Sequence, residues 1–245
     1  MAVGGPVRFD DAAVTAAWSQ SHLRGLPADV AAALRDGARL VHVPAGAIVR
    51  DVGEPGPYLE LLVDGFLRIL VRAPDGRSLT VRYLRRGDLS GAVSLFTPDY
   101  TLAATVQALV DSDIVSFRGD VVVALAERDI RVALAVIAEL SERVVKFVAE
   151  IPDNAFGTVR QRVARHLLDL ASDQRHGDRL VAAVSQQALA DAVGSVREVV
   201  VRVLHDLRAD GVIRTGRDGI ELLLPAVLVD EQFPARRPPG TRPGA

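Results

Sequence analysis

The sequence predicts an α+β fold in which an N-terminal β-roll is followed by a long helix and a small helical domain. Three observations predict it. Short β-branched segments alternate with glycine turns up to residue 118, helical periodicity begins near residue 120, and two short helical patterns flank Gly194. Many short strands with glycine turns at near-regular spacing are typical of an antiparallel barrel or roll. The 245 residues suffice for two domains with separate cores.

Composition narrows the classes of function. The formal net charge of −2 gives no general attraction to nucleic acid, although a few placed side chains suffice for specific binding. The absence of cysteine excludes disulfides, thiolate nucleophiles and cysteine-held metal clusters. No catalytic or metal-binding motif is found, so we expect neither an enzyme nor a metal site. Without a signal peptide or an apolar run of ~18 residues, we expect a cytoplasmic protein with no membrane partner.

The first 38 residues precede the strands. Residues 1–20 form a leader whose structure the sequence leaves open. Residues 21–38 predict a short helix that begins after Pro27, carries Asp29 near its start and ends near Gly37. The predicted sensory β-roll domain spans residues 21–119 and includes this helix.

Seven short segments of the roll predict strands. They are rich in β-branched residues, and turn signals at residues such as 44–46, 64–65 and 87–88 separate them. The predicted strands are residues 40–43, 47–50, 58–63, 66–71, 79–83, 102–108 and 114–117.

Residues 120–152 predict a dimerisation helix with a heptad repeat. β-Branched residues at the first position of each heptad favour a two-stranded parallel coiled coil, and the alternative is a single helix packed on its own roll. Pro152 is expected to end the helix and to leave a hinge at 153–154. The predicted seam consists of Ile130, Ala133, Ile137, Leu140, Val144, Phe147 and Ile151.

Residues 153–225 predict a winged helix-turn-helix domain, and residues 226–245 a disordered tail rich in proline and arginine. Apolar residues recur at helical spacing before the turn and after it. Arg214 and Arg217 in the predicted hairpin could reach DNA phosphates. The expected elements are helices at 158–172, 185–192 and 196–208 and a hairpin at 211–224.

The segment 185–207 has the pattern of a helix-turn-helix. Ser185 is expected to cap the first helix. Gly194 lies at the tight turn, where a left-handed backbone costs little only for glycine. Phased apolar residues on both sides of this glycine define two short helices that cross steeply.

The outward face of the second helix carries charges suited to reading bases. Arg197 and Glu198 open the helix, and Arg202 follows about one turn later. The first residues of a recognition helix reach base edges in the major groove, where arginine reads guanine and glutamate accepts from cytosine. The alternative is a solvated face with an ion pair between Glu198 and Arg202. We favour double-stranded DNA as the partner.

From about residue 20 to 225, the layout resembles the CRP/FNR family, the cyclic-AMP receptor protein and its relatives. The resemblance implies a cyclic-nucleotide-binding β-roll, a homodimer and palindromic DNA with TGTGA-like half-sites. It also implies base reading by Arg197, Glu198 and Arg202 and phosphate contacts at Ser185 and Gln186. Val196 stands where the family prefers a serine cap, and the neighbouring Ser195 could partly replace that cap. The likeness rests on Val43-Pro44-Ala45-Gly46, Gly53-Glu54, Leu62-Val63-Asp64-Gly65, Gly87-Asp88-Leu89-Ser90-Gly91 and Ser94-Leu95-Phe96, and on Gly194, Arg197-Glu198, Arg202 and Leu204.

The effector region departs from the family pattern. Where the family has a Gly-Glu-Leu turn this chain has Gly91-Ala92-Val93, and where an Arg-Ser pair holds the cyclic phosphate it has Leu102-Ala103. A buried phosphate without arginine loses charge-assisted hydrogen bonds and keeps its desolvation cost. We therefore expect no cyclic-AMP cofactor. These five residues are expected at a filled pocket, or at one for a less charged effector of unknown identity.

Two functions of different classes remain open from the sequence. The first is a bacterial transcription regulator of the CRP/FNR type that binds DNA without cyclic AMP, with RNA polymerase as a further candidate partner. The second is a small-molecule sensor that acts through protein partners and has a non-functional DNA domain. The presence of Arg197, Glu198 and Arg202 favours the first function.

Overall fold

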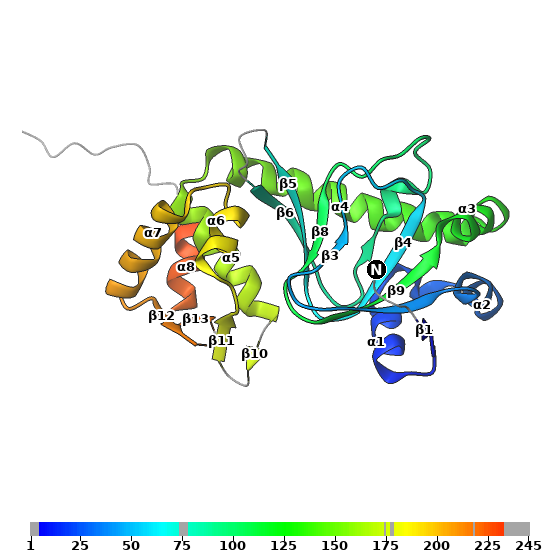
Figure 1. Cartoon of the computed structure of the whole chain (residues 1–245), viewed down its shortest axis with the longest axis horizontal. Coiled ribbons are helices and arrows are strands. Elements are labelled where there is room, and N and C mark those ends of the chain that lie inside the picture. Colours follow the sequence, from blue (N-terminus) through cyan, green and yellow to red (C-terminus); the bar gives the residue numbers. More distant parts are fainter. Residues whose placement is uncertain (1–4, 74–77, 174, 177–178, 218, 233–245) are drawn as a thin grey trace, which may run out of the picture. The chain divides into compact units, whose positions relative to one another are not determined.

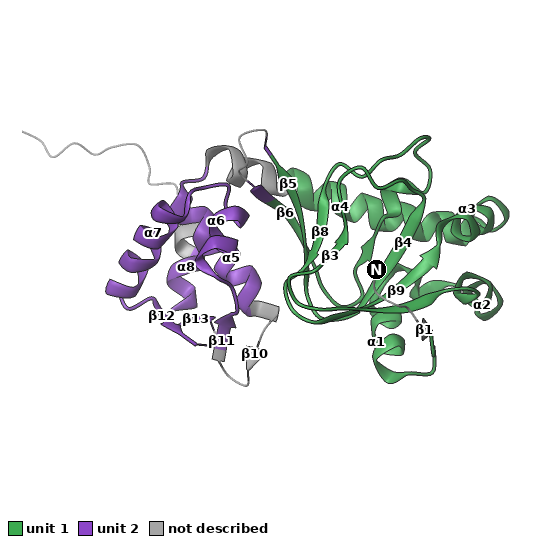
Figure 2. Cartoon of the chain, in the orientation of Figure 1, with its two compact units in different colours: residues 1–72, 80–149 green, residues 73–79, 150–245 purple. Residues whose placement is uncertain are grey.

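The computed structural model describes residues 5–73, 78–173, 175–176, 179–217 and 219–232. The chain forms two compact units (Figures 1 and 2). Unit 1 comprises residues 1–72 and 80–149, and unit 2 comprises residues 73–79 and 150–245. The strands predicted for the roll lie in or border unit 1, and both helices of the predicted helix-turn-helix lie in unit 2.

Two antiparallel sheets build the roll. One has the order β1-β2-β9-β4-β7 and the other the order β3-β8-β5-β6. All seven predicted strands are present with shifted ends. The largest shift is at 102–108, which is strand only from Thr105 onward. The strands are β1 (Gly5–Pro6), β2 (Arg39–Val43), β3 (Ile48–Arg50), β4 (Tyr58–Asp64), β5 (Leu67–Arg72), β6 (Ser78–Leu84), β7 (Leu89–Ser90), β8 (Thr105–Ala108) and β9 (Ser112–Arg118).

The apolar side chains of β4 alternate between two hydrophobic cores. Leu59, Leu61 and Val63 belong to the core that packs against the helices. Leu62 belongs to a second core, formed with residues of both sheets. Because side chains of a strand alternate between faces, Tyr58 and Glu60 share the face of Leu62. A carboxylate therefore stands on the inner side of the roll.

The leader is structured and packs on the roll. It contains α1 (Ala12–Gln20), and a 3-10 turn, η1 (His22–Gly25), follows. Trp18 of α1 is buried, and its ring makes edge contacts with Phe9 and Phe117 at centroid distances of 6.3 Å. Two further helices pack on this side of the roll: α2 (Ala28–Arg35), which begins directly after Pro27 as expected, and α3 (Gly119–Arg128).

The long helix α4 (Ile130–Phe156) does not end at Pro152. The predicted helix end and the hinge at 153–154 are wrong, because the helix continues for about one more turn. A proline removes only one backbone donor, and the neighbouring hydrogen bonds can carry the helix past it. The side chains of residues 149–156, Ile151 among them, lie outside the described ones.

Unit 2 is a small helical domain with a four-stranded sheet of order β10-β11-β13-β12. Two of its strands, β10 and β11, are too short to have been predicted. The predicted disordered tail is wrong at residues 226–232, which are helical and bury Leu228, while residues 233–245 lie outside the described ones. The elements are α5 (Val159–Asp173), β10 (Arg175–His176), β11 (Arg179–Ala182), α6 (Gln186–Ala192), α7 (Arg197–Ala209), β12 (Ile213–Gly216), β13 (Gly219–Leu222) and α8 (Pro225–Gln232).

His166 on α5 makes the stability of unit 2 sensitive to acid. Burial, together with the positive charges of neighbouring Arg165 and Arg162, lowers the pKa of His166 to about 3. Below pH 6.5 the unfolded chain takes up a proton that the folded domain refuses until about pH 3. The contribution of His166 to stability therefore falls as the pH falls through this window.

We expect the His166 effect to lower the free energy of unfolding by about 2 kcal/mol between pH 7 and pH 5. Urea unfolding followed by circular dichroism would measure it as the difference between the wild-type protein and His166→Gln. His205→Gln is the control, because His205 is exposed. Equal pH dependence in the wild-type protein and His166→Gln would contradict this assignment.

Candidate DNA interface and effector region

Helices α6 and α7 form the helix-turn-helix of unit 2. The Oγ atom of Ser185 accepts a hydrogen bond from the backbone N–H of Ala188 at 3.0 Å, which caps α6 as predicted. Gly194 has a φ of +62°, the left-handed conformation expected at the turn. The N–H of Ser195 donates to the carbonyl oxygen of Ala190 at 3.0 Å and closes the turn. The turn thus fixes where α7 begins.

The outward face of α7 is charged and free of partners. Val200, Leu204 and Leu207 are buried and hold the helix in its domain. Arg197, Glu198 and Arg202 are exposed on the other side. Within the part of the chain that the structure describes, these three side chains make no hydrogen bond and no ion pair. The Glu198–Arg202 pair of the alternative interpretation is therefore not formed, and all three groups are available to a ligand.

The remaining residues predicted to contact DNA lie at the starts of α6 and α7. Ser185 and Val196 are exposed, and Gln186 and Ser195 are half-buried. Val196 is the N-cap residue of α7 and makes no side-chain hydrogen bond to the helix. These four positions surround the turn that precedes the charged face.

The predicted hairpin of the wing is present as β12 and β13. Arg214 of this hairpin donates through Nε to the carboxylate of Glu221 at 2.8 Å. Contact between Arg214 and a phosphate would therefore compete with this ion pair. Arg217 is exposed.

The five residues predicted for the effector region do not form one buried cluster. Gly91 has a φ of +88° and begins the 3-10 turn η2 (Ala92–Ser94). A Cβ atom at position 91 would lie 2.4 Å from the Tyr58 ring, so only glycine fits there. Ala92 and Leu102 are buried, whereas Val93 and Ala103 are exposed.

A buried ion pair beside this turn was missed in the sequence. The Arg50 guanidinium lies 2.9 Å from the Oε1 atom of Glu60 and 3.2 Å from Glu54. Its Cζ atom lies 4.7 Å from the centroid of the Tyr58 ring, which in turn packs against Gly91. Burial raises the pKa of Glu60, and the charge of Arg50 opposes that shift. The charge of Arg50, which reaches the Gly91 turn through Tyr58, is thus already paired within the chain.

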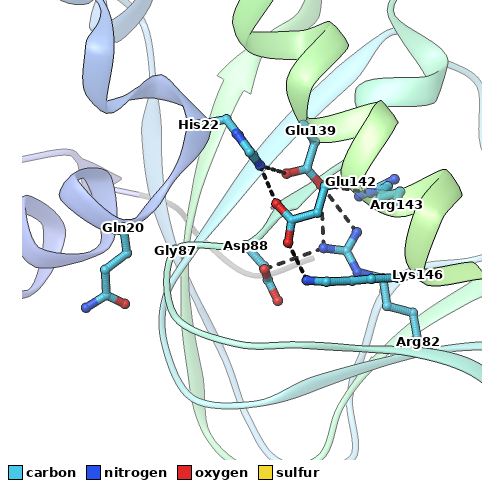
Figure 3. Close-up of a pocket in the computed structure, with 9 residues that line it drawn as sticks. All are labelled: Gln20, His22, Arg82, Gly87, Asp88, Glu139, Glu142, Arg143 and Lys146. Carbon is cyan, nitrogen blue, oxygen red and sulfur yellow. Dashed lines mark hydrogen bonds and ion pairs between the residues drawn. The ribbon is translucent and has the colours of Figure 1, made fainter. Parts of the chain in front are cut away.

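A separate charged pocket fixes α4 to the roll (Figure 3). Buried Glu139 accepts from Arg143 at 2.8 Å and lies 3.5 Å from Arg82 of β6. His22 of η1 lies 2.8 Å from Glu142. Cations and carboxylates pair throughout the pocket, so it joins three segments of unit 1. Its lining residues are Gln20, His22, Arg82, Gly87, Asp88, Glu139, Glu142, Arg143 and Lys146.

The seam predicted on α4 is divided between two surfaces. Ile130, Ile137, Val144 and Phe147 are exposed. Leu140 packs partly on the core of the roll, and Ala133 is half-buried. The exposed apolar face is completed instead by Leu134, Val145 and Val148, which a strict heptad does not include.

Other chemistry finds no support in the described residues. They contain no group of three His, Cys, Asp or Glu side chains that could hold a metal. No described helix is long and apolar enough to cross a membrane.

A helix-turn-helix whose second helix presents unpaired charges, in a chain that also contains a sheet-built roll, is typical of DNA-binding transcription regulators, a class that is not enzymatic. Residues 161–231 match the model of the Crp-like helix-turn-helix domain, and residues 40–129 match the cyclic nucleotide-binding domain. Both matches fall on the elements described above.

Similarity to known proteins identifies the family of the chain. It is 31% identical over 206 residues to the CRP-like cAMP-activated global transcriptional regulator of Mycobacterium tuberculosis, covering 78% of this chain and 87% of the relative. It is 31% identical over 182 residues to the transcriptional regulator LdrP of Thermus thermophilus, covering 73% and 89%. A solved CRP/FNR-family regulator from T. thermophilus is 26% identical, with a TM-score of 0.68 over 79% of this chain and 97% of that one. The chain belongs to the CRP/FNR family of transcription regulators.

Removing one partner of the Arg50–Glu60 pair should destabilise the folded protein. We expect Arg50→Met to lower the free energy of unfolding by about 3–5 kcal/mol, because it leaves the Glu60 carboxylate buried without its cation. Adding Glu60→Gln should recover part of that loss. Urea unfolding of both single variants and the double variant would measure the coupling. Strictly additive losses would show that the two groups do not interact energetically.

Proposed function

We propose that this regulator is a homodimer that binds a palindromic TGTGA-like DNA site without cyclic AMP. The observation that carries the proposal is the charged face of α7, where Arg197, Glu198 and Arg202 have no partner in the described chain. An unpaired arginine can make two hydrogen bonds to guanine O6 and N7, and a glutamate can accept from cytosine N4. Both bases occur in the proposed half-site, which also fits the family resemblance.

Residues around the turn would hold the phosphates. Ser185, Gln186 and Ser195 offer side-chain donors at the starts of α6 and α7. Contacts of this kind fix the register of the protein on the duplex but carry no sequence information. Val196 offers no donor, so fewer phosphate contacts are expected at the start of α7.

The exposed face of α4 supports the dimer. The side chains of Ile137 and Val144 are 54% and 61% exposed, and five other large apolar residues accompany them on this helix. A continuous apolar helix face of this kind is typical of helix pairing. In a dimer the two recognition helices would meet half-sites about one helical turn apart, roughly 34 Å.

The buried ion pair supports independence from cyclic AMP. The relative from Mycobacterium tuberculosis is named as a cAMP-activated regulator. In this chain a cyclic phosphate beside Gly91 would meet Arg50, whose charge is already paired with Glu60. Separating that pair leaves a buried carboxylate uncompensated, which costs several kcal/mol. The nucleotide must therefore overcome a penalty before it gains a contact.

We expect tight binding of the purified protein, without added nucleotide, to a TGTGA palindrome and weaker binding to a scrambled duplex. Fluorescence anisotropy at ~150 mM salt would measure both. Arg197→Ala and Glu198→Ala should each weaken specific binding by about tenfold or more, because a bidentate base contact is worth about 1–3 kcal/mol. Arg208→Ala is the matched control, since Arg208 lies at the far end of the same helix.

Three results would revise the proposal. Binding that appears only with cyclic AMP would remove the nucleotide independence but keep the regulator. Preference for another duplex would change the half-site. Equal binding to all duplexes, even at low salt, would favour the sensor that acts through protein partners.

The dimer is tested on the exposed face of α4. We expect Ile137→Glu and Val144→Glu to yield monomers, because each buries a carboxylate in an apolar interface. Multi-angle light scattering would report the mass of one chain instead of two. Val52→Glu is the control, because Val52 is equally exposed but lies in the roll. A variant pair that stays dimeric would place the interface elsewhere.

A further inference from the structure

One apolar side chain lies in the middle of the charged face of α7. Val201 is 38% exposed, although the exposed residues around it on this face are Arg197, Glu198, Arg202 and His205. At about 100° per residue, Val201 lies about 40° from Arg197 and about 60° from Glu198, on the arc between them. Any surface that contacts both charges also covers Val201.

The major groove offers one apolar group that such a side chain can recognise. Thymine alone presents a methyl group there, whereas the other base edges present donors and acceptors. Val201 lies about 6 Å along the helix from Arg197, and neighbouring base pairs are about 3.4 Å apart. A short branched side chain at this position therefore reaches a base within about two pairs of the one that Arg197 contacts.

The alternative is that Val201 helps to hold α7 in its domain. The buried residues of α7 are Val200, Leu204 and Leu207. At about 100° per residue, Leu204 lies about 60° from Val201, and Val200 and Leu207 lie about 100° and 120° from it. Valine also has a lower helix propensity than alanine or lysine, so an exposed valine does little for the helix itself. Val201 therefore borders the packed face of α7, and its exposed part lies on the arc between Arg197 and Glu198.

We propose that Val201 is a specificity residue that contacts the methyl group of one thymine in each half-site. This inference rests on the proposed function of α7 as the base-reading helix. A valine contact buries about one methyl group per half-site, which corresponds to about a fourfold gain in affinity for each. Arg197 and Glu198 would still select the neighbouring bases through hydrogen bonds.

The experiment removes the methyl group from the DNA. The preferred duplex is first selected from randomised half-sites with the wild-type protein. Each thymine is then replaced by deoxyuridine, which lacks only the methyl group. We expect one position per half-site at which the replacement weakens wild-type binding about fourfold, and about sixteenfold when both half-sites are changed.

Val201→Ala should show a smaller preference for thymine over deoxyuridine than the wild-type protein, and its binding should still depend on Arg197. Val227→Ala is the matched control, because Val227 is 37% exposed but lies on α8. This control should keep the wild-type preference for thymine. Because alanine favours the helix, Val201→Ala is not expected to unfold the domain.

Each result decides between the two proposals. If Arg197→Ala abolishes selectivity but no deoxyuridine matters, or if Val201→Ala keeps the wild-type preference, the role of Val201 is refuted and the regulator stands. If the wild-type protein selects no sequence, or Arg197→Ala keeps the selectivity, the base-reading role of α7 fails and Val201 fails with it.

Discussion

The function depends on one constraint on α7. Apolar residues on one face must hold the helix in its domain, while the charged side chains on the other face must have no partner within the chain. Burial of Val200, Leu204 and Leu207 supplies the first condition. The second is met because Arg197 and Arg202 find no carboxylate within the described chain. An arginine that is already paired must lose that pair before it can read a base, so internal salt bridges here would cost affinity. The wing shows the contrast, since Arg214 is held by Glu221.

In the roll, by contrast, the inner charged side chains Arg50 and Glu60 pair with each other. Arg50 and Glu60 form a buried pair where the strands curve around the Gly91 turn. A buried pair is weak evidence for stability, because desolvation offsets much of the attraction. Its effect on ligand choice is stronger, since any anion that enters must compete with a carboxylate already in place. Arg50 can therefore bind a phosphate only if its pair with Glu60 separates.

Local patterns predicted most of the fold, and long-range packing decided the rest. Alternation and turn residues located every strand of the roll except β1 and β7, and the phased apolar residues around Gly194 located α6 and α7. Helix α8 depends on its packing against α5, which a propensity rule does not see. The Arg50–Glu60 pair depends on which strands become neighbours, which neither strand reveals alone. A glutamate inside the apolar strand β4 was the available signal, because a buried carboxylate requires a cation from another segment.

The two faces of α4 link these findings to regulation. Val132, Val136 and Glu139 hold the helix on the roll, while Ile137 and Val144 leave an apolar face on the other side. A ligand can shift the orientation of DNA-binding domains only if it binds one orientation better than another. For an anionic ligand beside Gly91, that difference in affinity would include the cost of separating the Arg50–Glu60 pair. In the proposed homodimer, the orientation of the two α7 helices would depend on how the two chains pair along α4.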